Sequence, residues 1–309
     1  MPAGTNLYRL PLSGIDSSEV EGMDVLQSLL FVPADSLRKM ASARKMRPDG
    51  FIYDLEDAVP VASKVEARHL LSDELNSFIN PRPTIFVRVN GFDTAFVEDD
   101  LRVFVRPEVA GIVLPKCHDA SQIAQVHQEL SRLENQMSVP DGSVKLVPIL
   151  ESAKGVARAG ELARSSSRII ALFFGGEDFC ADMGITRSKN GDEIGVARSL
   201  VVLAAKSERL QVVDGPFTDF HDRARLFEET RRIRQMGFTG KALIHPDQIE
   251  TVHLAMAPSD EEIAAAQEIV SVFENSGRGV TVVRGKMIDE PIVAQARKLL
   301  QQSARERKT

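Results

Sequence analysis

Charged side chains follow short apolar runs at several points of the chain. In a parallel barrel or sheet, residues that follow strands meet at one edge, so these side chains are the first candidates for chemistry. An arginine together with several carboxylates suits a cation and the oxygens of a small acidic substrate. The segments are Asp54-Leu55-Glu56-Asp57, Val87-Arg88-Val89-Asn90, Leu150-Glu151-Ser152 and Gly176-Glu177-Asp178.

Glu151 and Asp178 are the predicted metal ligands. Two carboxylates without a histidine pair or a cysteine nearby favour Mg²⁺, with Mn²⁺ as an alternative, because these ions prefer oxygen ligands and retain waters. Gly155 follows Glu151 by four residues and two glycines precede Asp178, so both acids are expected on tight turns where the backbone can approach a ligand closely. The alternative for each acid is that it caps the following helix.

Arg88 is the predicted substrate-binding cation. A guanidinium after three apolar residues is costly to bury without an anionic partner. It would stabilise the enolate that develops when a bond beside a carbonyl breaks, or form a structural salt bridge to Glu56 or Asp57. Those two acids are expected to hold metal-bound waters or orient Arg88, with helix capping as the alternative.

Eight β-branched or aromatic runs alternate with helical spacing, which predicts a TIM (β/α)8 barrel. An open doubly wound sheet shares this alternation, but no glycine-rich dinucleotide fingerprint follows the first run. The predicted strands are Ser28–Pro33, Gly50–Leu55, Thr84–Asn90, Gly111–Lys116, Val144–Leu150, Arg168–Phe174, Gln211–Asp214 and Lys241–His245.

The chain divides into three predicted parts: a flexible extension over residues 1–24, a barrel over 25–257 and a helical C-terminal extension over 258–309. In the last part, Ser259–Asn275 and Ile288–Arg305 are predicted helices, and TVVRG between them is expected to be a hinge.

Composition excludes several classes of protein. A net charge of −6 with interspersed acids and bases disfavours a nucleic-acid partner. No apolar run is long enough to span a membrane, and the amino terminus does not resemble a secretory signal, so a soluble, cytoplasmic protein is expected.

These residues lie in motifs that resemble the citrate lyase β-subunit-like family, within the HpcH/HpaI aldolase superfamily and close to malyl-CoA and citramalyl-CoA lyases. The resemblance covers Ser28 to about Leu300. It rests on the ordered motifs SLLFVPAD, DLEDAV, VRVN, LPK, ESAKG, FGGEDFCADMG, ALIHPDQ and GKMID.

The resemblance implies a TIM barrel in which Glu151 and Asp178 bind Mg²⁺, while Arg88 and Glu151 contact the substrate. It also implies a homotrimer or hexamer whose tail places Asp289 over a neighbouring active site as an acid or base. From the residues alone, the preferred role of Asp289 is the N-cap of the last helix.

The implied reaction cleaves a 3-hydroxyacyl-coenzyme A thioester to acetyl-CoA, or a similar product, and a keto acid. Three alternatives remain open: a CoA-independent class II 2-keto acid aldolase, a hydroxyacyl-CoA thioesterase, and a citrate lyase β subunit that works in a complex. The sequence departs from the family at Gln27, where an arginine is usual, and at Ala34, where a glycine is usual; both are expected near the barrel mouth.

Overall fold

Eight short parallel strands close into a barrel in sequence order, and β1 pairs with β8. The computed structural model describes residues 25–77, 83–277 and 279–306, so the predicted extension over 1–24 lies outside the described residues. The TIM-barrel prediction is confirmed, and the open-sheet alternative is wrong. The strands are β1 (Ser28–Pro33), β2 (Gly50–Asp54), β3 (Thr84–Arg88), β4 (Gly111–Leu114), β5 (Lys145–Leu150), β6 (Ala171–Phe174), β7 (Gln211–Asp214) and β8 (Gly240–Leu243).

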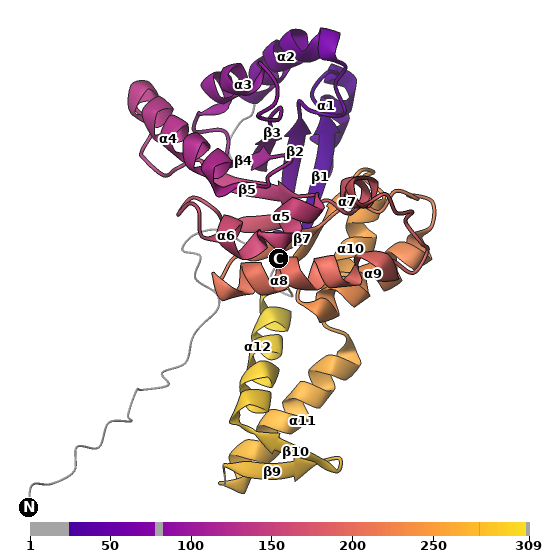
Figure 1. Cartoon of the computed structure of the whole chain (residues 1–309). Coiled ribbons are helices and arrows are strands. Elements are labelled where there is room, and N and C mark those ends of the chain that lie inside the picture. Colours follow the sequence, from indigo (N-terminus) through magenta and orange to yellow (C-terminus); the bar gives the residue numbers. More distant parts are fainter. Residues whose placement is uncertain (1–24, 78–82, 278, 307–309) are drawn as a thin grey trace, which may run out of the picture.

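Helices surround the barrel (Figure 1). They are α1 (Leu37–Ala43), α2 (Lys64–Asn76), α3 (Val97–Phe104), α4 (Ala120–Met137), α5 (Ala153–Ala157), α6 (Ala159–Ala163), α7 (Gly176–Met183), α8 (Gly195–Ser207), α9 (Arg223–Met236) and α10 (Gln248–Met256). Short 3-10 turns, η1 (Val61–Ser63) and η2 (Asp192–Ile194), precede α2 and α8.

Alternation along the strands produces two apolar layers. Leu29, Ile52 and Phe86 belong to a buried cluster formed chiefly by strand residues, whereas their neighbours Leu30 and Phe51 pack with residues of the surrounding helices. Because successive strand residues face opposite sides, each apolar run serves both layers. At Gly240 a Cβ atom would lie 1.8 Å from the carbonyl oxygen of Leu26, so only glycine fits where β8 begins.

The C-terminal extension contains α11 (Asp260–Ser276), an antiparallel hairpin of β9 (Val280–Val283) and β10 (Lys286–Asp289), and α12 (Glu290–Glu306). It projects from the barrel, with the hairpin at its far end (Figure 1). The predicted hinge at TVVRG was wrong, because this segment belongs to the hairpin, whereas the predicted helix Ile288–Arg305 is confirmed as α12 with a start two residues later. Arg284 and Gly285 both have positive φ, 50° and 76°, the combination of a type I′ hairpin turn.

Among the described residues, no helix has both the length and the apolar character needed to cross a membrane.

Candidate active site

A cavity of about 430 Å³ opens at the carboxyl ends of the barrel strands. Residues at or just after the ends of seven strands line it, among them Pro33, Asp54, Arg88, Glu151 and Gly215. The structure therefore brings together the side chains that the sequence placed after separate strands. Phe31 and Phe173 make an edge-to-face contact, with ring centroids 6.1 Å apart, within its apolar wall.

Arg88 is held by a buried carboxylate that the sequence analysis did not assign to it. Its Nε and Nη2 donate to the two oxygens of Asp54 at 2.7 and 2.6 Å. Asp54 and Arg88 face one another in the parallel register of β2 and β3, which explains the pairing. Two planar donors against two oxygens fix the orientation of the guanidinium.

Glu56 and Asp57 also lie beside Arg88, with carboxylate oxygens 3.0 and 3.7 Å from Nη1. Burial alone would lower the pKa of Arg88, but hydrogen bonding and proximity to Asp54 hold the pKa above its usual value. The guanidinium is thus a permanent positive charge in the cavity wall. Its Cζ lies 4.9 Å from the ring centroid of Phe31, so one face of the group is stacked.

Lys116 is a second cation that the sequence analysis missed. Its Nζ lies 2.9 Å from Oε1 of Glu56, and its backbone N–H donates to Oε1 of Glu151 at 2.6 Å. Lys116 has a positive φ of 55°, a backbone conformation that residues other than glycine adopt at some cost in free energy. This conformation turns the amide toward Glu151. The LPK motif located the residue, but its backbone conformation is not readable from sequence.

Glu151 is buried, with 6% of its surface exposed, whereas Asp178 is exposed in the first turn of α7. Burial, and after it the neighbouring charge of Asp178, raises the pKa of Glu151 to about 8. A Cβ atom at Gly175 would lie 2.6 Å from Cβ of Glu151, so the glycine turn is what admits the carboxylate. Within the described part of the chain, no cationic side chain is bonded to either carboxylate, so the pair concentrates negative charge.

This donor set fits a hard divalent cation. A positive ion between Glu151 and Asp178 would offset both the burial of one carboxylate and the repulsion between the two. Within the described ranges, no group of three or more histidine, cysteine, aspartate or glutamate side chains is arranged to hold a metal. Two protein carboxylates suit Mg²⁺, which keeps several waters, better than zinc, which takes three or four protein ligands.

Asp289 is not brought to this cavity within one chain. It ends β10 in the projecting extension, and its Oδ1 accepts a hydrogen bond from the amide of Ile292 at 3.5 Å. That contact is the N-cap arrangement that the sequence also allowed. Its acid–base role would require a neighbouring chain.

The two departures from the family pattern lie at opposite ends of β1. Ala34 follows the strand at the cavity end, is fully buried, and donates its backbone N–H to the carbonyl of Asp54 at 3.0 Å. Gln27 precedes the strand, and its carbonyl accepts from the amide of Lys241 at 2.9 Å. The expectation that Gln27 lies near the mouth was therefore wrong.

A second buried ion cluster forms the wall of the cavity at β7 and β8. Asp214 accepts hydrogen bonds from Arg198 at 2.9 and 2.8 Å and from Lys241 Nζ at 2.6 Å. Lys241 also contacts Glu229 at 2.9 Å. The sequence analysis missed this cluster because its members come from α8, β7, α9 and β8, and only the closed barrel joins them.

The fold and cavity define an α/β-barrel enzyme with two neighbouring carboxylates, one buried and one exposed, and a fixed arginine at the carboxyl ends of its strands. The profile of the HpcH/HpaI aldolase/citrate lyase family matches residues 27–246. The chain belongs to this family, as its motifs indicated, and it is an enzyme of the carbon–carbon lyase class.

Among similar proteins, the citrate lyase subunit beta of Leuconostoc mesenteroides subsp. cremoris is 33% identical over 89% of this chain and 92% of its own length. The mitochondrial citramalyl-CoA lyase of Mus musculus is 31% identical over 89% and 85%. The (3S)-malyl-CoA thioesterase of Cereibacter sphaeroides is 32% identical over 89% and 93%.

A solved structure of the CitE protein of Mycobacterium tuberculosis, in complex with magnesium, acetoacetate and coenzyme A, has a TM-score of 0.77 and 30% identity. The match covers 90% of this chain and 98% of that one.

Proposed function

We propose that this protein is a Mg²⁺-dependent lyase that cleaves a 3-hydroxyacyl-CoA of the malyl-CoA, citramalyl-CoA or citryl-CoA type. The products would be acetyl-CoA, or a similar thioester, and a keto acid. The observation that carries the proposal is one cavity in which a fixed guanidinium lies with the buried Glu151 and the exposed Asp178, neither of which has a cationic partner among the described residues. The relatives named as citrate lyase and citramalyl-CoA lyase support the same class of substrate.

Glu151 and Asp178 would hold the metal ion. When bound, Mg²⁺ supplies positive charge where an enolate oxygen develops and helps to hold the oxygens of a keto or hydroxy acid. Mn²⁺ would be accepted by the same oxygen ligands. The magnesium and coenzyme A in the related CitE structure support this assignment.

Arg88 would bind the acidic substrate and stabilise the enolate. Asp54 occupies Nε and one N–H of Nη2, so the orientation of the group is set before a substrate arrives. Nη1 also lies 3.0 Å from Glu56, so a substrate oxygen would use the N–H groups of Nη1 and Nη2 that neither carboxylate meets. Such preorganised donors stabilise developing charge without reorganisation during the reaction.

Asp289 would donate or accept the proton from a second copy of the chain. The ion-paired residues Asp54 and Asp214 are poorly placed to exchange protons, and Glu151 and Asp178 are assigned to the metal. A homotrimer or hexamer would let each extension reach a neighbouring cavity. This assignment is tested by mixing Glu151→Gln and Asp289→Asn chains during refolding or co-expression.

If Asp289 acts on a neighbouring chain, the two inactive variants complement each other, and about a quarter of the sites in a random mixture regain both residues. Mixtures that stay as inactive as either variant alone would contradict the assignment. Each variant mixed with itself is the control.

A thioesterase is the second candidate, because one relative is named a malyl-CoA thioesterase. The same carboxylates and arginine would then serve hydrolysis with water as nucleophile. Because relatives are named as citrate lyase subunits, a subunit that acts in a complex is a further candidate. A CoA-independent aldolase is another, because Ala34 departs from the family pattern after β1.

One assay separates these candidates. The purified protein with Mg²⁺ is offered malyl-CoA, citramalyl-CoA and the free acids, and release of keto acid and of free thiol is followed. Keto acid without thiol, from thioesters alone, is the expected result for the lyase. Thiol release would identify a thioesterase, turnover of free acids an aldolase, and no turnover without a carrier protein a complex-dependent subunit.

A further inference from the structure

A second hollow, of about 180 Å³, adjoins the main cavity. The two share Glu177, Arg187, Pro216 and Thr218 in their walls, so the hollow lies directly beside the main cavity. Its walls come from the loop after α7, the loop after β7 and the first turn of α9. The roles proposed above for the metal, the enolate and the proton do not use this hollow.

Lys189 and Arg225 are two cations in the walls of the hollow, and neither has an acidic partner among the described residues. Nε of Arg225 is buried and makes no hydrogen bond there. The guanidinium carbon of Arg225 lies 4.9 Å from the ring centroid of Phe217, so stacking orients the group and leaves its N–H edge available. A buried donor without an acceptor is costly, and an anion in the hollow would satisfy it.

Arg187, the third cation of the hollow, is by contrast fully engaged. It lies 3.1 Å from Glu177, 2.7 Å from Glu193 and 3.9 Å from Glu229. The walls of the hollow hold three cations, Arg187, Lys189 and Arg225, and two carboxylates, Glu177 and Asp219. The uncompensated charge of the hollow is therefore positive.

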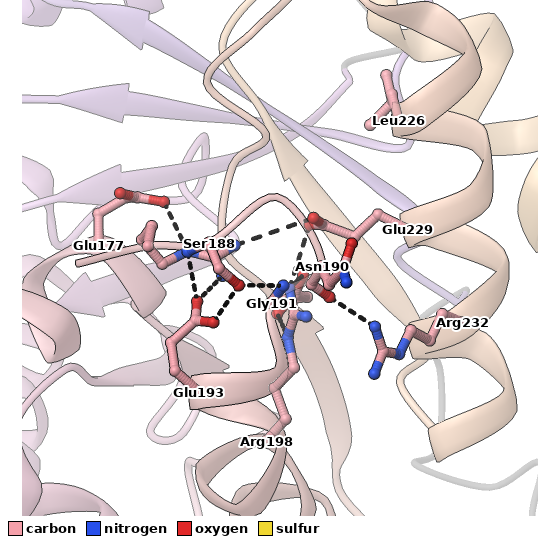
Figure 2. A network of polar contacts seen from close by, with 12 residues as sticks. Glu177, Ser188, Asn190, Gly191, Glu193, Arg198, Leu226, Glu229 and Arg232 are labelled. Carbon is pink, nitrogen blue, oxygen red and sulfur yellow. Dashed lines mark hydrogen bonds and ion pairs between the residues drawn. The ribbon is translucent and has the colours of Figure 1, made fainter. Parts of the chain in front are cut away.

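The loop that carries Lys189 is held in place by polar contacts (Figure 2). Glu193 accepts hydrogen bonds from the amide and hydroxyl of Ser188, and Arg232 of α9 contacts the carbonyl of Asn190 and, at 2.7 Å, Asp192. The loop and α9 thus hold Lys189 and Arg225 beside the same hollow before any ligand binds. Preorganisation of this kind lowers the entropic cost of binding.

We propose that this hollow binds an oxyanion at the far end of the substrate whose reacting end lies at Glu151, Asp178 and Arg88. The occupant is a carboxylate of the acyl part or a phosphate of the nucleotide part, which share the chemistry that two cations recognise. The identification of the oxyanion as part of the substrate rests on the proposed function, whereas the binding of an oxyanion to the hollow does not.

The test compares Arg225→Gln with Arg225→Lys and with a matched control, Arg231→Gln. Arg231 lies on the same helix and stacks on Phe227 with a centroid distance of 6.0 Å, but it does not line the hollow. Calorimetry with inorganic phosphate and with malonate, at constant ionic strength, measures binding without turnover.

Arg225→Gln should raise the dissociation constant of at least one probe about tenfold, since a charge-assisted hydrogen bond contributes about that factor. Arg225→Lys should retain part of the affinity and Arg231→Gln all of it. Equal affinity of the wild-type protein and Arg225→Gln for both probes overturns the proposal, provided that circular dichroism shows both folded. Binding that responds to Arg225 in a protein without lyase activity would refute the proposed function alone.

The KM of Arg225→Gln then distinguishes the sources of the oxyanion. A roughly tenfold rise for malyl-CoA but not for the malyl thioester of pantetheine identifies a phosphate. A rise for both thioesters identifies the acyl carboxylate. An unchanged KM for both excludes the hollow from substrate binding and overturns that part of the proposal.

Discussion

Two buried carboxylates line the same cavity and differ in what surrounds them. Glu151, after β5, has Asp178 beside it, and burial raises its pKa to about 8. Asp214, at the end of β7, is equally removed from water, yet Lys241 and Arg198 hold its pKa below the usual value. Burial opposes the charge in both places, so the neighbours decide the outcome.

The difference separates a structural carboxylate from one that is available for a ligand. Around Asp214, the protein supplies the compensating cations and every oxygen is bonded. At Glu151, it supplies one backbone N–H and a second acid. A strongly perturbed pKa of this kind is more frequent at functional sites than elsewhere, which makes Glu151 the stronger candidate of the two.

The largest effect is expected from Lys241→Met, which removes the compensation at Asp214. The ammonium is fully buried and contacts both Asp214 and Glu229, so two carboxylates lose a partner. Breaking a buried pair from one side costs about 3–5 kcal/mol of unfolding free energy. Urea unfolding measures the loss, and the exposed Lys286→Met is the control. A loss as small as that of the control would show that the cluster is not structural.

Removal of a carboxylate from the pair Glu151 and Asp178 should lower activity and leave folding intact. Glu151→Gln and Asp178→Asn are each expected to lower kcat/KM by about 10²–10³-fold and to weaken Mg²⁺ binding, by loss of a ligand and of charge stabilisation. In the metal-free protein both variants should be at least as stable as the wild type, because repulsion between the two acids is relieved. Unchanged Mg²⁺ dependence in both would remove them from the metal site.

Arg88→Lys tests the guanidinium at the end of β3. A single ammonium cannot reproduce the paired donors that meet Asp54 and still face the cavity. We expect kcat/KM to fall by about 10²-fold and the unfolding free energy to fall by about 1–3 kcal/mol, because the buried Asp54 loses one of its two hydrogen bonds with Arg88. Arg102→Lys, at an exposed arginine of α3, is the control. Full activity in Arg88→Lys would exclude a role for the guanidinium in the reaction.

The smallest effect concerns Glu193, which braces the loop in Figure 2. Burial would raise its pKa, but hydrogen bonds, led by that from Ser188, lower the pKa from 4.5 to about 2. Because the folded pKa lies below the unfolded one, this stabilisation is complete above pH 4.5 and is lost as pH falls toward 2.

Glu193→Gln should therefore cost about 1–2 kcal/mol of unfolding free energy at neutral pH. The difference from the wild type should shrink as the solution is acidified from pH 4.5 toward 2. Denaturant unfolding at a series of pH values measures it, and a difference independent of pH would assign the effect to packing instead of charge.

The site was predictable where local sequence was enough. Glu151, Asp178 and Arg88 each follow or end an apolar run, and a parallel barrel brings strand ends together. The partner of Arg88 was not predictable, because Glu56, Asp57 and Asp54 lie in one short segment and only the register of β2 against β3 selects Asp54. The backbone of Lys116 was missed for a similar reason, since its positive φ depends on the loop after β4.

The hairpin in the C-terminal extension was not predicted, although its signal is local in the sequence. The segment VTVVRGKMID contains β-branched residues before a two-residue turn, and this pattern is a local signal for a hairpin. The signal was not used because the apolar runs of the barrel strands are stronger. Its consequence is that Asp289 ends a strand instead of lying inside a helix. The position of that residue relative to a neighbouring cavity depends on assembly, and its role stays a prediction.

By itself, the sequence determined the eight strands, the barrel, the family and the residues that follow each strand, because periodicity and motifs are local properties of the chain. The tertiary structure alone decided which charges are compensated. Asp214 and Glu151 look alike in sequence, but residues from α8 and β8 neutralise one, whereas a turn in α7 places a second acid beside the other. Electrostatic interactions depend on distances in space, and closure of the barrel sets those distances.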